Sequence, residues 1–224
     1  RRRTSLKAIE WCGTGFLVTV ETDSETKNLR ADLVVHGAGR VPAIDQLDLA
    51  AANVEAGDKG VAVNAYLQST SNPKIYAAGD AADTRGAPLT PVAVFEGKVA
   101  ASNMLKGNRT KPDYAGVPSA VFTVPELTRV GMLEEEAREA GHDIRVVEND
   151  TGDWYSNLRV GESCAATKVI IDNESDTILG AHLLGPEYGE IINFFGLAVR
   201  LGLTTSDLKK MVSAYPSVGS DLGS

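Results

Sequence analysis

The stretch Ile75-Tyr76-Ala77-Ala78-Gly79-Asp80 decides how this chain is interpreted. Its apolar residues predict a short buried strand that ends on a glycine followed by a carboxylate. In open α/β sheets, ligands bind at the carboxyl ends of the strands. Gly79 lets a backbone or a ligand approach closely there, and Asp80 can accept hydrogen bonds from sugar or ribitol hydroxyls. Taken alone, the pattern fits a turn residue or a helix N-cap at Asp80 equally well.

A helix is predicted to open at Pro91 and to run to about Lys106, because proline favours the first helical position and Gly107 follows the end. A helix N-terminus presents unpaired N–H groups and about half a positive charge. A flavin gains negative charge at its pyrimidine end on reduction, so a helix that starts at Thr90-Pro91 could stabilise the reduced form. An ordinary surface helix that begins with proline is the alternative.

A third motif, Val34-Val35-His36-Gly37-Ala38-Gly39-Arg40, follows a predicted hairpin of residues 15–20 and 29–35 that feeds a buried strand. It is not the GxGxxG dinucleotide fingerprint, which needs another glycine and a following helix. Small residues after a strand suggest a crossover between two nucleotide domains. His36 fits a packed or exposed histidine better than a catalytic one. Arg40 could face a phosphate or cap the loop.

The C-terminal part has a different pattern, beyond a linker at residues 108–118. Antiparallel strands are predicted at residues 144–148, 165–171 and 178–184. A short charged helix is predicted at residues 133–140 and the strongest helix at residues 187–201. The apolar face of that strongest helix comprises Ile191, Phe195, Ala198 and Leu201. Thr204 and Asp207 resemble a capping box for a last helix at residues 206–213.

Composition excludes several classes of protein. The 224 residues carry a net charge of −8, which argues against a nucleic-acid partner. No apolar run approaches the ~20 residues of a membrane span, and no secretory pattern opens the chain. Cys12 and Cys164 form no CxxC pair, so a reduced cytoplasmic location is expected and no metal site is predicted. The start at Arg1, without Met and within an element, predicts a fragment.

These motifs, in this order and at this spacing, resemble the second half of the glutathione reductase, dihydrolipoamide dehydrogenase and mercuric reductase family, the pyridine nucleotide-disulfide oxidoreductases. The resemblance also covers residues 117–126, 131–137 and 178–186, and extends from about residue 31 to residue 221. It implies an α/β plus α+β fold: a partial FAD/NAD(P)-binding domain followed by a dimerisation domain built of an antiparallel sheet and helices. Residues 1–39 would end the NAD(P)-binding domain, 40–113 would be the central FAD-binding segment, and 114–224 the dimerisation domain.

The resemblance also implies the cofactors FAD and NAD(P)H and a homodimer that works with an N-terminal half not included in this sequence. Gly79 and Asp80 match the segment that binds the FAD ribitol, and Thr90 with Pro91 matches the helix start over the flavin pyrimidine. Near the nicotinamide nucleotide, the matching positions are Gly39, with the adjoining Arg40, and Ala120.

Two features of the family are missing from the sequence. Its Gly-rich FAD fingerprint and redox cysteine pair belong to the N-terminal half. Its acid–base His-Pro and following Glu fall at Tyr215-Pro216 and Ser220, with Asp221 one position further on. A phenol with an ordinary pKa of about 10 does not replace imidazole as a base at neutral pH. Thiol–disulfide chemistry of the glutathione reductase kind is therefore not expected, and Tyr215 either orients a substrate, as the catalytic candidate, or packs at an interface.

Three hypotheses follow. In the first, the intact protein passes electrons from NAD(P)H through FAD to an acceptor other than a glutathione-type disulfide. In the second, the 224-residue chain alone is a catalytically inactive dimerisation module, because half of the flavin site is absent. The third, a free-standing α+β protein with a ligand near Asp80, is disfavoured by the apolar surface that an incomplete nucleotide domain would expose.

Overall fold

The computed structural model describes residues 3–37 and 39–223. The chain divides into two compact units, Arg1–Val41 and Pro42–Ser224. The domain boundaries predicted at residues 39/40 and 113/114 remain predictions. No helix in the described ranges is long and apolar enough to cross a bilayer.

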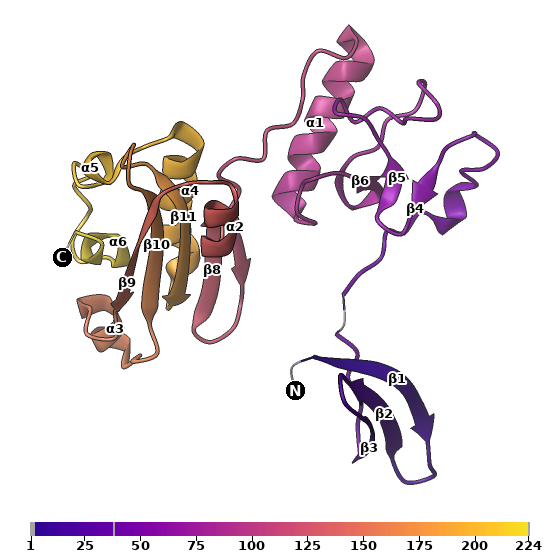
Figure 1. Ribbon diagram of the computed structural model, residues 1–224, viewed down its shortest axis with the longest axis horizontal. Helices are drawn as coiled ribbons and strands as arrows, with labels where there is room; N and C mark the ends of the chain where they lie inside the picture. Colours follow the sequence, from indigo (N-terminus) through magenta and orange to yellow (C-terminus); the bar gives the residue numbers. More distant parts are fainter. Residues whose placement is uncertain (1–2, 38, 224) are drawn as a thin grey trace. The chain divides into compact units, whose positions relative to one another are not determined.

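The N-terminal unit is an antiparallel sheet of β1 (Thr4–Trp11), β2 (Phe16–Thr22) and β3 (Thr26–Ala31), drawn in indigo in Figure 1. β2 confirms the strand predicted at residues 15–20. The prediction of a buried strand reaching residue 35 is wrong. β3 ends at Ala31, and Leu33 and Val35 are 73% and 82% exposed. β3 pairs only with β2 among the described strands, so nothing there covers these apolar side chains.

The next segment, residues 42–113, combines short strands with one long helix. It contains η1 (Asp45–Leu47), β4 (Ala56–Gly57), β5 (Gly60–Ala62), η2 (Gly79–Ala81), β6 (Ala82–Asp83) and α1 (Thr90–Lys106). β5 is the middle strand, antiparallel to β4 and parallel to β6. Gly60, with φ of +117°, allows this close pairing, because a Cβ there would lie 2.6 Å from the Ala81 carbonyl oxygen.

The strand predicted at residues 75–78 is replaced by an extended segment with a single antiparallel bridge, between Gln68 and Tyr76. These residues are half-buried. The segment is short because the chain turns through Pro73 before it and through Gly79, with φ of +64°, after it.

α1 confirms the helix predicted from Pro91, and it ends before Gly107, where φ is +77°. Val99 and Ala100 pack against Leu67, so one face of the helix covers the preceding loop. Asn103 is buried on the same face. It donates to the Tyr66 carbonyl at 2.9 Å and accepts from the Thr110 N–H at 3.0 Å, which holds the chain where it leaves the helix.

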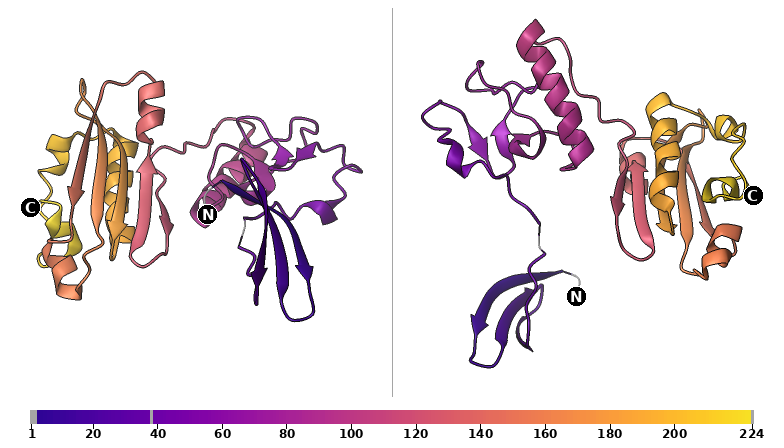
Figure 2. Two further views of the ribbon diagram at one scale, coloured as in Figure 1. Left: turned by 60° about the horizontal axis from the view of Figure 1, so that its bottom comes forward. Right: turned by 180° about the vertical axis from the view of Figure 1, so that it is seen from behind.

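The C-terminal part is a five-stranded antiparallel sheet with helices on both faces (Figure 2). The strand order is β7-β8-β11-β10-β9, formed by β7 (Ser119–Val121), β8 (Glu126–Gly131), β9 (Ile144–Asp150), β10 (Ala166–Asp172) and β11 (Ile178–Gly185). The helices are α2 (Glu134–Glu139), α3 (Tyr155–Val160), α4 (Tyr188–Leu201), α5 (Thr205–Leu208) and α6 (Val218–Asp221). The three predicted strands, their antiparallel pairing and the helix at α2 are confirmed.

The two faces of this sheet follow from strand periodicity. Val169 of β10 faces the cluster built around α4, and its neighbour Ile170 faces the cluster that contains Ala137 of α2. On α4, Ile191 and Phe195 are buried against β8 and β11. Both faces of the central strands are therefore covered.

Two predictions for the C-terminal helices need correction. Leu201, predicted on the buried face of α4, is the last residue of the helix and is 61% exposed. The last helix was predicted over residues 206–213, but α5 ends at Leu208. The capping box is present: Asp207 N–H donates to Thr204 Oγ1 at 3.1 Å, and Thr204 N–H donates to Asp207 Oδ2 at 3.1 Å.

Candidate functional site

The Gly79–Asp80 turn lies directly against the first turn of α1. A Cβ at Gly79 would lie 2.7 Å from the Ala93 Cβ, so only glycine allows this approach at a φ of +64°. Asp80 is exposed, and its carboxylate has no hydrogen-bond or ion-pair partner within residues 3–37 and 39–223. The turn thus presents a free acceptor beside a helix start.

The start of α1 offers complementary groups. Its N-cap residue is Leu89, and no side chain in the described part of the protein caps the helix. Thr90 and Pro91 are exposed in the first turn. The first N–H groups of a helix lack internal partners and attract negative charge. A carboxylate acceptor and uncapped amides therefore lie on adjacent segments; the former can accept a hydroxyl, and the latter can bind a negatively charged oxygen.

Glu96 connects the Gly79–Asp80 turn to α1, and it was not among the site residues predicted from the sequence. It is 0% exposed on the inner face of α1. Its Oε2 accepts the Gly79 N–H at 2.6 Å, and its Oε1 accepts the hydroxyls of Thr84 at 2.8 Å and Tyr114 at 2.7 Å. An acidic residue between Val92 and Val99 on an apolar stripe is the signal that could have revealed it.

Tyr114 belongs to the linker that follows the nucleotide segment. Burial, and next the hydrogen bond to Glu96, raise the pKa of Tyr114 to about 12. A neighbouring position is equally constrained: a Cβ at Gly86 would lie 2.6 Å from Glu96 Oε1 and 2.9 Å from the Tyr114 ring. The carboxylate is thus enclosed on several sides.

The other predicted site residues lie elsewhere in the chain. Gly39 and Arg40 are exposed and belong to the N-terminal unit, whereas Asp80 and Thr90 belong to the second unit. Ala120 is half-buried on β7, paired with Thr128 of β8. The structure therefore brings Gly79 and Asp80 together with the α1 start, and leaves the remaining candidates on separate elements.

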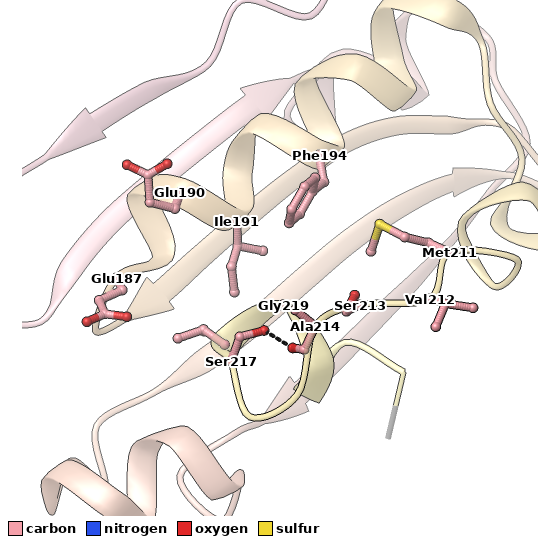
Figure 3. A pocket seen from close by; sticks show the side chains of 11 residues that line it. Glu187, Glu190, Ile191, Phe194, Met211, Val212, Ser213, Ala214, Ser217 and Gly219 are labelled. Atoms are coloured by element: carbon pink, nitrogen blue, oxygen red, sulfur yellow. Dashed lines mark hydrogen bonds between the residues drawn. The ribbon is translucent and has the colours of Figure 1, made fainter.

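Tyr215, the catalytic candidate, is 76% exposed. Its ring lies 6.1 Å from the ring of Tyr155, and both side chains line a cavity of about 1050 Å³ beside β9 and β10. A smaller cavity of about 440 Å³ lies between α4 and residues 211–219, and Phe194, Met211 and Ser213 line both cavities. Figure 3 shows Phe194 of α4 facing this cavity, with Met211 and Ser217 across from it.

No group of three or more His, Cys, Asp or Glu side chains within residues 3–37 and 39–223 could hold a metal ion. Cys12 and Cys164 are both exposed and unpaired with each other.

Family profiles cover both parts of the chain. Residues 1–97 match the pyridine nucleotide-disulphide oxidoreductase family, and residues 117–223 match its dimerisation domain. The chain belongs to the pyridine nucleotide-disulphide oxidoreductase family.

Individual proteins of known sequence also match this chain. An uncharacterised 19.7 kDa protein in a mercuric resistance operon of Staphylococcus aureus is 51% identical over 79% of this chain and 98% of its own length. Dihydrolipoyl dehydrogenase of Bacillus subtilis is 33% identical over 95% of this chain but 45% of its own length. Mercuric reductase of Staphylococcus aureus is 33% identical over 96% of the chain and 39% of its own length. The chain therefore spans less than half of these two enzymes.

Solved structures agree on the fold. The HOCl-induced flavoprotein disulfide reductase RclA from Escherichia coli matches with a TM-score of 0.82 and 28% identity, over 97% of this chain and 49% of that one. LpdA from Mycobacterium tuberculosis, at 21% identity and a TM-score of 0.84, covers 98% of this chain and 47% of its own, and supports the fold alone.

Proposed function

We propose that this chain is the C-terminal part of a flavoprotein oxidoreductase that passes electrons from NAD(P)H through FAD to an acceptor other than a glutathione-type disulfide. The observation that carries the proposal is the free Asp80 carboxylate on a turn packed against the uncapped start of α1. Asp80 would hold the ribitol and the amides at Thr90 would face the pyrimidine. Bound FAD would supply the two-electron chemistry.

The remaining residues have narrower proposed roles. Gly39, Arg40 and Ala120 would lie near the nicotinamide nucleotide. Tyr215 would orient a substrate, because its ring is exposed at 76% and supported by Tyr155. An acceptor that needs no histidine base accords with the tyrosine at this position.

The electron-transfer proposal is tested on the full-length protein that contains this chain. Rapid mixing with excess NADH or NADPH, followed at the flavin absorbance, should show bleaching of the oxidised flavin. Flavin that stays oxidised with both nucleotides would contradict the proposal. Lipoamide and mercuric ion, suggested by the names of the relatives, are the first acceptors to compare, and little lipoamide reduction is expected.

A homodimer through the C-terminal part is the second element of the proposal. Phe194, Leu197 and Leu201 lie at helical spacing on α4 and are 40%, 55% and 61% exposed. Val212, 96% exposed, adds to the apolar side chains near them. Such a stripe on a domain matched by a dimerisation-domain profile favours a second copy of this chain as its partner.

The alternative function is a catalytically inactive dimerisation module formed by the 224-residue chain alone. One relative is 51% identical, and the matched region covers 98% of that relative's own length, which supports a role for a protein of about this size. Sedimentation and FAD titration of the purified chain separate the two candidates. A dimer with negligible FAD affinity is expected of the module, whereas tight stoichiometric binding of FAD would overturn it. A cytoplasmic location remains a prediction.

A further inference from the structure

We infer that Glu96 is a positioning residue, whose buried carboxylate fixes the Gly79–Asp80 turn and the Tyr114 linker against α1. The part of this role that concerns the flavin rests on the function proposed above. Glu96 joins two segments on either side of α1 in the sequence: it bonds to Gly79 and Thr84, which lie 17 and 12 positions before it, and to Tyr114, which lies 18 positions after it.

The hydrogen-bond partners of Glu96 distinguish its surroundings from an ordinary apolar contact. A buried carboxylate is unfavourable unless its oxygens are well hydrogen-bonded. Every hydrogen-bond donor to Glu96 is neutral, and no Lys, Arg or His in the described ranges forms an ion pair with it. An apolar residue would complete the stripe between Val92 and Val99, yet it would leave three partly buried donors without this acceptor.

The bond to Gly79 is the one that concerns Asp80. Gly79 is the first residue of η2, whose N-cap Ala78 provides no side-chain acceptor. Its N–H would therefore be an orphan donor without Glu96. Because the same glycine packs against Ala93, the bond fixes where the Asp80 carboxylate lies relative to the α1 start.

The geometry predicts different effects for two substitutions. In Glu96→Gln, the amide oxygen can accept the Gly79 N–H while the NH₂ group donates to the hydroxyls of Thr84 and Tyr114, which can reverse to accept. In Glu96→Leu, no acceptor remains. Glutamine should therefore preserve the turn and leucine should release it.

Hydrogen exchange on the full 224-residue chain tests this directly. Glu96→Leu should speed exchange at the Gly79 amide and in peptides around Tyr114 by about tenfold or more, with strands β10 and β11 unchanged. Glu96→Gln should stay within about threefold of the wild type, a smaller change than the loss of one net hydrogen bond. Unchanged exchange at Gly79 in Glu96→Leu, or equal effects of both variants, would overturn the inference.

Two further measurements test the contacts of Glu96 independently of the Glu96→Leu variant. Should Glu96→Leu fail to fold, Thr84→Val, which removes one of the hydroxyls bonded to Glu96, should still speed exchange at the Gly79 amide. No change at Gly79 in that variant would count against the inference. The phenol of Tyr114, assigned by comparison with Tyr114→Phe in an absorbance titration, should titrate lower in Glu96→Gln than in wild type, because the carboxylate that accepts its proton is removed. An unmoved titration would count against the contact between Glu96 and Tyr114.

Flavin binding is measured separately, on the full-length protein that contains this chain. Glu96→Leu should raise the Kd for FAD by about tenfold or more, and Glu96→Gln should change it little. Absence of flavin from the wild-type protein would refute the proposed function, whereas the role of Glu96 in fixing the turn would still be decided by hydrogen exchange.

Discussion

The carboxylate of Asp221 in α6 accepts two hydrogen bonds from one residue of α3, Ser156. The donors are the backbone N–H, at 3.1 Å, and the hydroxyl. Asp221 is 4% exposed and Ser156 is 5% exposed. This contact ties α6, which follows Tyr215 in the chain, to the helix that begins with Tyr155, and the two rings lie 6.1 Å apart beside it.

The first prediction concerns this brace. Asp221→Ala should lower the free energy of unfolding by about 1–3 kcal/mol, because two buried donors lose their acceptor. Both bonds use the same oxygen, so Asp221→Asn can keep them and should lose much less. Urea denaturation of both variants measures the difference. Equal losses would show that charge, not hydrogen bonding, holds the brace.

The second prediction concerns the cap of α4. Glu126 Oε2 accepts the Gly189 N–H at 2.7 Å, whereas the N-cap residue Glu187 makes no such bond. Glu126→Ala should destabilise the protein by about 0.5–2 kcal/mol, the usual effect of losing a cap. A Cβ at Gly189 would lie 2.9 Å from Glu126 Oε2. Gly189→Ala should therefore stabilise the Glu126→Ala background more than the wild type.

A double-mutant cycle of these two substitutions, followed by thermal and urea unfolding, measures their coupling. Additive effects would contradict a direct contact between the Glu126 carboxylate and the start of α4.

The third prediction concerns pH. Hydrogen bonds from the Ser175 backbone, then from the His142 and Ser175 side chains, lower the pKa of Asp172 to about 2. An unfolded-chain aspartate titrates near about 3.9. A lowered pKa contributes stability above that value, and the contribution is lost as the pH falls towards 2. Asp172→Asn should therefore be less stable than wild type at pH 5, and the gap should narrow by pH 2. Urea denaturation midpoints of both proteins between pH 5 and pH 2 test this prediction. A stability difference that stays constant over this range would contradict it.

The fourth prediction concerns the proposed dimer. Leu197→Lys places a charge in the exposed apolar stripe of α4 and should convert a dimer of the chain to a monomer, because the charge would be buried at the interface. Leu105→Lys is the matched control, since Leu105 is 84% exposed on α1 and lies outside the stripe. Sedimentation velocity reports the oligomeric state. A Leu197→Lys chain that remains dimeric would place the interface elsewhere.

Local sequence signals were sufficient where a single element contains its own determinants. Pro91 and Gly107 mark α1, and Thr204 with Asp207 forms the predicted capping box. The alternation along β10 places Val169 and Ile170 on opposite faces. These features depend on neighbours within a few residues, where backbone propensity and side-chain spacing act directly.

Partners distant in the chain had to come from the tertiary structure. The sequence marks Glu96 only as an acidic residue on the apolar stripe of α1, and the fold brings Gly79, Thr84 and Tyr114 around it. The same holds for Asp221 with Ser156, 65 positions apart. The sequence alone predicted the Asp80 turn and the start of α1. Burial depends on how the whole chain packs, so only the fold revealed Glu96, the buried carboxylate that fixes the turn against the helix.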